Sequence, residues 1–467
     1  MSAQLVGEQE VIGQLPIALQ RWLTLERFHL HKAEMFQDRS RDPGFDSRYF
    51  PQNCGAFELP CFWVRRKHLL VYRRSATDEN ELSLLAGQSS SERMLFPIHP
   101  ASLVNYAAFL SEVGAEDAAN EGLRIWAVPT SSTRTLFAWP DGAPEKALLV
   151  KVSLHSPIFG DRRLYARTVG RSVGLSGLVH DSRADLPSAV DYFPESLGFV
   201  PRRLPDSGVL IRSIPREIKE GRILVAPLFS LLGGSGSHNP VLLTLLERNG
   251  MEPRQWLEET LCAPFANLWL EMSLRFGLIL EAHGQDLMLA LSPDLNPLGR
   301  FYYRDFEGLQ VDWELRHRLG LPTCDLMPHA WRWRETYDTW GYPYGEFAWY
   351  KWRISLMHYL HFVLNEVELS LRQWHERALI PGPKFEAGEV TMLFSRRLFE
   401  AIESRCGIRA GPPYDIYRSL NRFTIFLMKV RREICLAGGS LQARAALQAQ
   451  YRAASACARA ARHPAAS

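Results

Sequence analysis

Apolar residues recur at three- and four-residue spacing over several long stretches of the chain, and this spacing predicts amphipathic helices. The clearest stripe runs from Leu257 to Ile279, where Pro264 is expected to kink or divide the helix. A helical pattern also occupies residues 1–50, with Trp22 and Leu23 among its apolar positions. Further helices rich in aromatic residues are expected at 345–380, 388–405 and 411–436.

Short apolar runs separated by turn signals fill residues 94–232 and predict β-strands. The runs are LRIWAVP, RTLFAWP, ALLVKVSL, GVLIRSI and RILVAPLF. PDG at 140–142 lies between two of them and predicts a hairpin, because each of its residues suits a turn. Residues 56–74 also have the pattern of strands, and a second hairpin is expected where SPDLNPLG connects LMLAL to RFYYRDF.

The order of these patterns predicts an α+β protein with a cleft between its middle and last thirds. The polar stretch from Ser75 to Arg93 is expected to be a linker, and LLGGSGSHNP at 231–240 interrupts the chain again. The expected regions are an N-terminal part, a β-rich part, a mixed and helical part, and an Ala/Arg-rich tail. Their bounds are 1–93, 94–236, 237–440 and 441–467.

At 467 residues the chain exceeds one ordinary hydrophobic core, so two or three packed domains are expected. Its 54 Lys and Arg residues against 51 acidic residues leave a net charge of +3, too small to indicate nucleic acid or a membrane as a partner. The beginning, MSAQLVGEQEVIG, lacks the features of a secretory signal. Seven cysteines without a CxxC pair argue against a disulfide framework or a zinc site and favour a cytoplasmic protein.

Polar residues gather at the open end of the second predicted hairpin. EAHGQD at 281–286 precedes its first strand, and RDFEG at 304–308 ends its second. Because a hairpin returns the chain to the edge where it began, the two segments should lie side by side. Side chains alternate along FYYRDF, so Phe301, Tyr303 and Asp305 are expected to share one face of the sheet.

The residue types at this edge suit a divalent cation. Two acids and an amide beside His283 can supply the oxygen ligands that Mg²⁺ takes when it bridges to substrate phosphates. The alternative is that Arg304 and Asp305 simply form an ion pair at the end of a strand. The occurrence of both segments at hairpin spacing favours the functional interpretation.

Basic residues and hydroxyls occur between and within the predicted strands. PTSSTRTL at 129–136 surrounds Arg134 with hydroxyls, which suits a triphosphate or a carboxylate, although an ordinary polar turn has the same composition. Lys151 lies inside ALLVKVSL, where a buried ammonium needs a partner such as phosphate, unless the head group reaches water at an edge. Arg212 is a further basic residue in an apolar strand, and His99 lies between two prolines in FPIHP.

The motifs FPIHP, PTSSTRTL, LLVKVSL followed by an arginine, EAHGQD and RDFEG resemble, in this order, the IucA/IucC family of NRPS-independent siderophore (NIS) synthetases. The resemblance implies a cupped-hand fold with a helical thumb, β-rich fingers and a mixed, helical palm. It also implies an ATP-dependent ligase that adenylates citrate or a related polycarboxylate and condenses it with an amine or alcohol in siderophore biosynthesis. A homodimer is expected from the resemblance alone.

The same resemblance assigns roles to individual residues. Lys151 would act in catalysis and contact phosphate, and His283 and Arg163 would hold the carboxylate, with His283 also assisting proton removal from the nucleophile. Asp286 and Asp305 would be the Mg²⁺ ligands. The nucleotide-binding residues would be Ser132, Arg134, Lys151, His99, Gln285, Asp286 and Asp305.

Departures from the family pattern bear on the substrate and the metal. Phe159 stands where members commonly have threonine before the carboxylate-binding arginine, so citrate itself is in question. Asp286 stands where the family usually has asparagine, which changes one metal ligand from an amide to a carboxylate. For the late palm lysine of the family, Lys429 in FLMKVRRE is a candidate only.

Two other hypotheses stay open. HGQD followed by DFEG also resembles the HGD…DFE pattern of aminoglycoside-phosphotransferase-like kinases, which use ATP and Mg²⁺ as well. Against a kinase, the N-terminal part has no convincing glycine-rich loop, and LMLALSPDL follows Asp286 where an early asparagine is expected. The other hypothesis is a degenerate, non-catalytic family member that binds a metabolite or scaffolds a pathway, which Phe159 would support.

Overall fold

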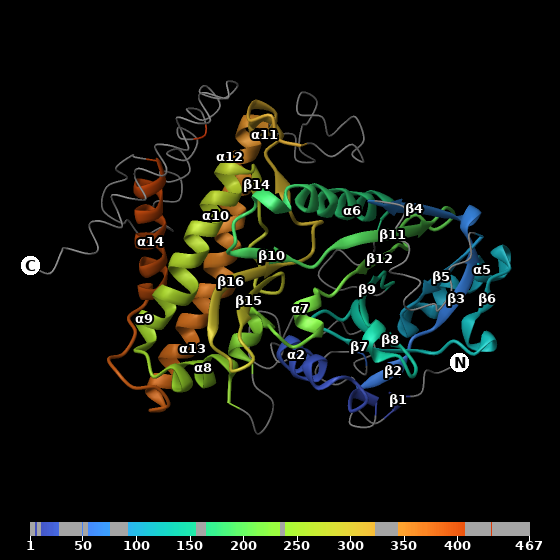
Figure 1. Ribbon diagram of the computed structural model, residues 1–467, viewed down its shortest axis with the longest axis horizontal. Coiled ribbons are helices and arrows are strands. Elements are labelled where there is room, and N and C mark those ends of the chain that lie inside the picture. The colour runs from blue at the N-terminus through green and yellow to red at the C-terminus, as the bar shows by residue number, and fades with distance from the viewer. Residues whose placement is uncertain are drawn as a thin grey trace, which may run out of the picture.

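Helices gather at one end of the protein, and β-sheets occupy its middle and its other end (Figure 1). The computed structural model describes residues 5–6, 11–27, 49, 55–74, 92–155, 165–233, 239–322, 344–406 and 431. Within these ranges the sheets and their flanking helices form a mixed architecture, which confirms the predicted α+β class. Across the same ranges, none of the helices is both long enough and apolar enough to traverse a membrane.

An antiparallel sheet of eight strands forms the centre of the β-rich part. Both of its faces are covered, since every residue of β8 (Thr135–Pro140) and β9 (Leu148–Val152) is buried. These two strands form the hairpin predicted at 140–142, and Gly142 takes a φ of 72° in its turn. The other strands, from one edge to the other, are β1 (Leu5–Val6), β2 (Ala56–Glu58), β7 (Ile125–Pro129), β12 (Val209–Arg212), β11 (Glu195–Pro201) and β4 (Leu69–Arg73).

Helix α6 (Ala166–Asp181) packs across β11 on one face of this sheet (Figure 1). The contact is close because Gly198 has no side chain, and a Cβ there would lie 2.3 Å from Cγ1 of Val169. The sequence pattern does not predict this helix, because the glycines in ARTVGRSVGLSGLVHD lower helix propensity. Tertiary packing therefore overrides local preference in α6.

A smaller sheet and helix α5 (Leu103–Val113) close the far end of the β-rich part (Figure 1). They enclose a second hydrophobic core, in which the ring centroids of Phe96 and Phe199 lie 5.8 Å apart. The strands of this sheet, in order, are β5 (Arg93–Pro97), β3 (Cys61–Arg65) and β6 (Glu116–Asp117).

The second predicted hairpin is confirmed and lies inside a four-stranded sheet. Its strands β15 (Leu287–Leu291) and β16 (Pro297–Tyr303) run antiparallel, with Leu287 opposite Tyr303. This register brings the chain before residue 287 and the chain after residue 303 to the same edge. The outer strands are β10 (Val190–Tyr192), parallel to β16, and β13 (Leu224–Pro227), antiparallel to β15.

A layer of helices lies beside the four-stranded sheet (Figure 1). The helical pattern predicted from Leu257 to Ile279 is divided beside Pro264, as predicted. A π-helical turn, η10 (Glu258–Cys262), separates two helical segments there. Proline lacks the N–H that would continue the α-helical ladder. The helices of this layer are α8 (Val241–Asn249), α9 (Pro253–Leu257), α10 (Ala263–Arg275), α12 (Tyr344–Tyr359), α13 (Asn365–Glu376) and α14 (Glu389–Cys406).

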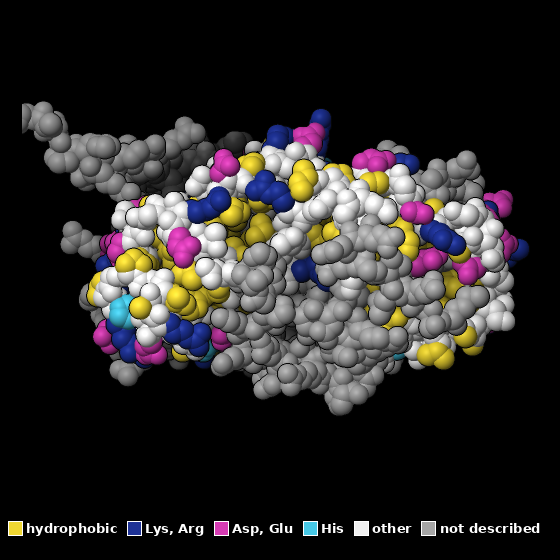
Figure 2. Space-filling view, turned by 90° about the horizontal axis from the view of Figure 1, so that it is seen from below, with side chains coloured by type: hydrophobic (Ala, Val, Ile, Leu, Met, Phe, Trp, Pro, Cys, Tyr) yellow, Lys and Arg dark blue, Asp and Glu magenta, His cyan; other side chains and the backbone are white. Residues whose placement is uncertain are grey.

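On the face shown in Figure 2, the described Lys and Arg side chains of this helical end are mixed with Asp and Glu.

The sheets cross the region boundaries expected at residues 93 and 236. Strands β1, β2 and β4 precede residue 93 but belong to the eight-stranded sheet, while β10 and β13 precede residue 236 but pair in the four-stranded sheet. Helix α2 (Ile17–Arg27) packs against β13, and the ring of Trp22 stacks on Phe193 with 6.0 Å between centroids. The division into regions stays a prediction, and the tail 441–467 lies outside the described residues.

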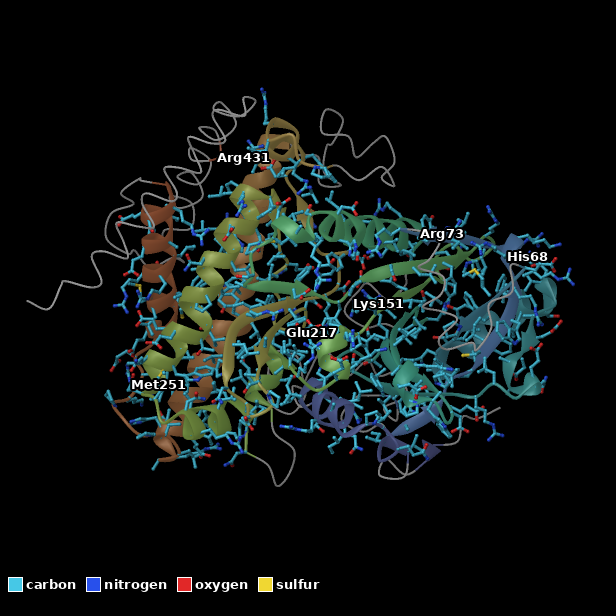
Figure 3. All side chains as sticks on the ribbon, viewed as in Figure 1. His68, Arg73, Lys151, Glu217, Met251 and Arg431 are labelled. Atoms are coloured by element: carbon cyan, nitrogen blue, oxygen red, sulfur yellow. The ribbon has the colours of Figure 1, made fainter. Side chains whose placement is uncertain are left out.

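A buried ion pair fixes Arg431 to the turn that begins α11 (Trp313–Arg318). Arg431 donates from Nε and Nη2 to the Asp312 carboxylate at 2.6 and 2.9 Å. The same carboxylate accepts a hydrogen bond from the backbone N–H of Leu315 at 2.9 Å, in the first turn of the helix. Figure 3 places Arg431 beside the upper end of the helical layer. Lys429 lies outside the described residues.

We expect Arg431→Ala to lower the free energy of unfolding by about 3–5 kcal/mol, because the substitution leaves the buried Asp312 carboxylate without its counter-ion. Denaturant titration of the purified variant measures this loss. Arg216→Ala is the matched control, since it removes an exposed pair with Glu220 and should change stability very little. Equal losses in the two variants would contradict the anchoring role of Arg431.

Candidate functional site

The two acidic segments, residues 281–286 and 304–308, meet at one end of the central strands of the four-stranded sheet, as the hairpin predicted. The backbone N–H of Arg304 donates to the carbonyl of Asp286 at 3.0 Å. The Arg304 side chain donates twice to the carbonyl of Gln285, from Nε at 3.0 Å and from Nη2 at 2.8 Å. Residues 281–286 and 304–308 therefore form one surface rather than two separate turns.

Asp305 lies beyond the strand in an uncommon backbone conformation. Strand β16 ends at Tyr303, and Asp305 has a φ of 69°, in the left-handed region. The expectation that Asp305 continues the face of Phe301 and Tyr303 is therefore wrong, because a left-handed residue takes the chain out of the strand. Aspartate and asparagine tolerate this region better than most side chains, and residues held there often cluster at functional sites.

Lys151 is the buried partner of Asp305. Its side chain is only 2% exposed, and its Nζ lies 2.8 Å and 2.7 Å from the two carboxylate oxygens of Asp305. The Oε2 atom of Glu307 is 3.7 Å from the same ammonium. Figure 3 places Lys151 near the centre of the molecule. The partner that burial requires for Lys151 is thus a carboxylate, and Asp305 does not pair with its neighbour Arg304.

A second buried ion pair contacts the residue that follows Asp305. Arg212 on β12 donates to Oε1 of Glu195 on β11, from Nε at 2.9 Å and also from Nη2. The other oxygen of Glu195 accepts a hydrogen bond from the backbone N–H of Phe306 at 3.2 Å. Burial raises the pKa of the Glu195 carboxyl, and the charge of Arg212 opposes this effect. The pair ties the residue after Asp305 to the eight-stranded sheet.

The carboxyl groups of Asp305 and Asp286 shift in opposite directions. Burial would raise the pKa of Asp305, but the surrounding positive charges, Lys151 foremost, outweigh burial and hold it below its ordinary value. Burial raises the pKa of Asp286, and the charges of Asp305 and Glu281 raise it further. A cation placed between such carboxylates would relieve their repulsion, so the pair fits Mg²⁺. In the described ranges, no three His, Cys, Asp or Glu side chains form a ready metal cage.

Residues 131–134 form the tip of the hairpin between β7 and β8. Thr130 closes the hairpin, because its N–H and its hydroxyl both donate to the carbonyl of Thr135, at 2.9 and 2.8 Å. The N–H of Ser132 donates to the hydroxyl oxygen of Thr130 at 3.2 Å, and the Ser132 and Arg134 side chains are half-buried. Arg134 also lowers the pKa of Asp305, so its charge lies close enough to act on the acidic segments.

Ser131 connects this tip to the acidic segments. Its carbonyl accepts a hydrogen bond from Nε2 of Gln285 at 2.7 Å, and its hydroxyl accepts one from Nη2 of Arg304 at 2.5 Å. The hydroxyl donates in turn to Oε1 of Glu26, in the last turn of α2, at 2.9 Å. Neither Ser131 nor Glu26 was predicted from the sequence as a residue of the site. The only signal was a carboxylate placed directly after the apolar positions of α2.

His283 lies against aromatic rings. The centroid of its ring is 4.8 Å from that of Phe229 and 5.2 Å from that of Phe362. Phe229 approaches so closely because residue 284 is glycine, where a Cβ would lie 2.3 Å from Cδ1 of Phe229. Burial lowers the pKa of His283 to about 3, so the ring is neutral near neutral pH. Its Nδ1 accepts a hydrogen bond from the N–H of Gln285 at 3.3 Å, which leaves the ring proton on Nε2.

Two further titratable side chains that the sequence analysis did not single out lie beside His283. The Oε1 atom of Glu281 is 3.5 Å from Nδ1 of His358 on α12, and the rings of His283 and His358 are 6.0 Å apart. Gly308 gives the carboxylate its room, since a Cβ there would lie 1.6 Å from Oε2 of Glu281. Acid, base and carboxylate groups thus surround the edge of the sheet, an arrangement that can bind ligands and transfer protons.

His99 has a structural place in the second hydrophobic core. Its ring is fully buried, with centroids 5.0 Å from Tyr49 and 5.9 Å from Phe57. Its Nδ1 accepts a hydrogen bond from the N–H of Ala101 at 3.1 Å and so caps a short turn. Burial lowers the pKa of His99 to about 3. The ring has no exposed surface in this structure through which it could contact a phosphate. The nucleotide contact assigned to His99 stays a prediction.

The buried His99 ring should make stability depend on pH. Below about pH 6.5 the unfolded chain binds a proton at this histidine that the folded ring does not bind until about pH 3, so acidification favours unfolding. His99→Asn keeps a capping oxygen but cannot be protonated. We therefore expect it to lower the dependence of the free energy of unfolding on pH by about 1.4 kcal/mol per pH unit. Denaturant melts between about pH 6 and 4 measure the two slopes, and equal slopes would contradict the assignment.

The structure therefore unites most of the predicted site and leaves part of it untested. It brings Ser132, Arg134 and Lys151 to the acidic segments that carry His283, Gln285, Asp286 and Asp305. His99 lies in a different core. Arg163 and Phe159, on which the carboxylate site depends, fall in 156–164, outside the described residues.

Solved structures of NIS synthetases have the same fold as this chain. The petrobactin biosynthesis protein AsbB from Bacillus anthracis matches with a TM-score of 0.58 and 17% identity, over 76% of this chain and 62% of AsbB. ATP-bound aerobactin synthetase IucA from a hypervirulent Klebsiella pneumoniae matches with a TM-score of 0.52 and 16% identity, over 79% of this chain and 74% of IucA. For aerobactin synthetase IucC from the same pathotype the values are 0.53 and 16%, over 77% and 65%. The cupped-hand fold predicted from the motifs is confirmed.

Similarity in sequence is confined to a short stretch. The chain is 31% identical over 77 residues to the NRPS-independent siderophore synthetase-like protein ankE of Aspergillus thermomutatus, which is 16% of this chain and 13% of ankE. No family model matches the chain. Since the match spans 62% of AsbB and 65% of IucC, the chain corresponds to a little under two thirds of those proteins.

Proposed function

We propose that this chain, which has the fold of the NIS synthetases, is an ATP-dependent ligase of siderophore biosynthesis. It would adenylate citrate or a related polycarboxylate and condense the acyl group with an amine or alcohol. The observation that carries the proposal is the meeting of Lys151, Arg134 and the hydroxyls of the tip with two acidic segments at the centre of the molecule. That ATP is bound in a protein of the same fold, IucA, supports the choice of nucleotide.

The triphosphate would bind between the tip at 131–134 and Lys151. Ser132 and Arg134 offer a neutral donor and a planar fork of charged donors, which together suit phosphate oxygens. Lys151 already lies beside the tip, because the N–H of Val152 donates to the carbonyl of Arg134 at 2.9 Å. A phosphate oxygen would compete with Asp305 for the Lys151 ammonium and so weaken the ion pair between Lys151 and Asp305.

Asp305 and Asp286 would hold Mg²⁺, with Gln285 against the nucleotide. Bound Mg²⁺ supplies charge neutralisation at the phosphate oxygens. The raised pKa of Asp286 fits this role, because a cation would stabilise the charged carboxylate that burial, Asp305 and Glu281 now destabilise. Loss of part of the Lys151 contact would leave Asp305 free to share its oxygens with the cation.

The proposed reaction has two steps. A carboxylate oxygen of the substrate attacks the α-phosphorus, and the bond to pyrophosphate breaks, leaving an acyl-adenylate. The amine or alcohol then attacks the acyl carbon, AMP leaves with the electrons of the broken acyl–oxygen bond, and a base takes the proton of the nucleophile. Lys151 and Arg134 would stabilise the negative charge that builds on the phosphate oxygens in the first step.

The buried state of His283 favours one of its two predicted roles. With a pKa of about 3 the ring is a weak base near neutral pH, which favours orientation of the carboxylate through Nε2–H over removal of a proton. Arg163 would hold the same substrate. Glu281 and His358 lie beside His283 and supply carboxylate and imidazole groups for the proton. A cytoplasmic location and a homodimer remain predictions from the sequence.

The test is the formation of AMP and pyrophosphate from ATP and Mg²⁺ in the presence of single carboxylates. The panel contains citrate, 2-oxoglutarate, succinate and further dicarboxylate derivatives, because Phe159 leaves the acid open. We expect carboxylate-dependent release of AMP and pyrophosphate with at least one member. ADP as the product would instead support the kinase hypothesis, which the HGQD and DFEG segments alone favour. If the chain neither turned over nor bound ATP, the result would support a non-catalytic role.

A further inference from the structure

We infer that Glu26, on the N-terminal helix α2, is a positioning residue for the nucleotide-binding tip at 131–134, an inference that rests on the proposed function. Glu26 is fully buried and lies far along the chain from both of its partners, Ser131 and Arg304. It belongs to a helix that the family resemblance assigns to the thumb and to which no role in the site was given. The contacts of its carboxylate nevertheless reach the tip directly.

One oxygen of Glu26 contacts both the tip and the acidic segments. Its Oε1 accepts hydrogen bonds from the N–H of Ser131 at 3.3 Å, from the Ser131 hydroxyl at 2.9 Å and from Nη1 of Arg304 at 2.6 Å. The remaining donors of Arg304 are directed at the Ser131 hydroxyl and the carbonyl of Gln285. A single carboxylate therefore connects helix α2, the tip and the acidic segments.

These contacts fix the orientation of the Ser131 peptide and hydroxyl. Because the hydroxyl donates to Glu26, its lone pairs face Arg304, and the carbonyl of Ser131 is left to Gln285. Ser132 follows directly and Arg134 lies three residues after Ser131, so the direction of their side chains depends on this anchored peptide. A charge at residue 26 is needed for the arrangement, since a neutral amide would leave the buried guanidinium of Arg304 without its counter-ion.

Stability alone does not account for a carboxylate at this position. Burying an ion pair is costly, and well-packed apolar side chains often stabilise a protein equally or better. Moreover, Oε2 of Glu26 is buried and accepts no hydrogen bond from any residue that the structure describes. An incompletely satisfied buried carboxylate stabilises the fold poorly but defines the directions of its donors, which is what a positioning residue must do.

The test compares Glu26→Gln, Ser131→Ala and the double variant with the wild-type chain. Amide hydrogen exchange at 131–134 and 284–286 should rise about tenfold in each single variant, since a hydrogen bond to a charged group is lost. The Kd for ATP should rise about tenfold, and the double variant should resemble the single ones because the residues act through each other. Ser131→Ala keeps the ion pair with Arg304 and so tests the inference even if Glu26→Gln folds poorly.

Glu389→Gln is the matched control. It removes the partly buried pair with Arg254 at the helical end, so its exchange at the tip and its ATP affinity should equal those of the wild-type chain. Unchanged exchange at the tip in both Glu26→Gln and Ser131→Ala, or an equal rise in Glu389→Gln, would overturn the inference. A wild-type chain that binds no ATP would contradict the proposed function, while exchange at the tip would still decide whether Glu26 positions it.

Discussion

Replacing Asp305 with asparagine should reduce carboxylate-dependent AMP formation at least about a thousandfold, because the site loses the charge that faces Lys151 and that would hold the proposed cation. Asparagine has nearly the same shape and tolerates the φ of 69° at this position, so the change isolates the charge. Alanine should abolish activity equally but also strain the backbone by about 1–2 kcal/mol. The measurement is AMP release under saturating ATP, together with thermal melting of both variants.

The control for Asp305→Asn is the same substitution at an exposed turn. Asp141 follows β8, and its Oδ1 accepts a hydrogen bond from Nε1 of Trp126 at 3.1 Å, which an asparagine oxygen can still do. We expect Asp141→Asn to keep wild-type activity and stability. If Asp305→Asn retained more than about a tenth of wild-type activity, Asp305 could not be a cation ligand of the reaction.

Arg134→Ala should reduce kcat/KM for ATP about a hundredfold or more, through both a lower kcat and a higher KM. The half-buried guanidinium offers a fork of charge-assisted donors to phosphate, and removing such donors from an anion site has effects of this size. The fold should survive, because Thr130 and Thr135 close the hairpin without help from this side chain. Arg134→Lys should fall between the wild type and alanine, since it keeps the charge and loses the fork.

Arg124 provides a matched comparison from the other end of the β7–β8 hairpin, where it directly precedes β7. It is exposed and lies 4.0 Å from Glu58, far from any role in the proposed site. Arg124→Ala should change kcat/KM for ATP by less than about twofold, since an exposed pair of this kind contributes little. Equal losses in Arg124→Ala and Arg134→Ala would mean that net charge, rather than a phosphate contact, explains the effect.

Local signals in the sequence were sufficient for the hairpins and for the divided helix. PDG predicted the β8–β9 turn, and the alternation of β15 and β16 around SPDLNPLG placed the two acidic segments together. Pro264 marked the interruption before α10 because its effect on the backbone needs no tertiary partner. Where a feature depends on a few neighbouring residues, the prediction and the structure agree.

Long-range contacts could not be predicted in the same way. The partner of Lys151 lies 154 residues away, and Arg304 pairs with Glu26 rather than with its neighbour. A single sequence states that a buried charge needs a partner but not which one. The left-handed backbone at Asp305 escaped for a related reason, since strand alternation describes a residue only while the strand continues.

Glu26 and Arg304 lie 278 residues apart in the sequence, so the ribosome synthesises these two partners at different times. At a synthesis rate of about 5–20 residues per second, Arg304 emerges about 14–56 seconds after Glu26. In the first part of that interval the apolar side of α2, with Trp22 and Leu23, lacks strand β13, against which it packs in the folded chain. The nascent chain thus exposes the apolar side of α2 until β13 has been synthesised, and we expect chaperones that hold emerging chains to bind the helix during that time.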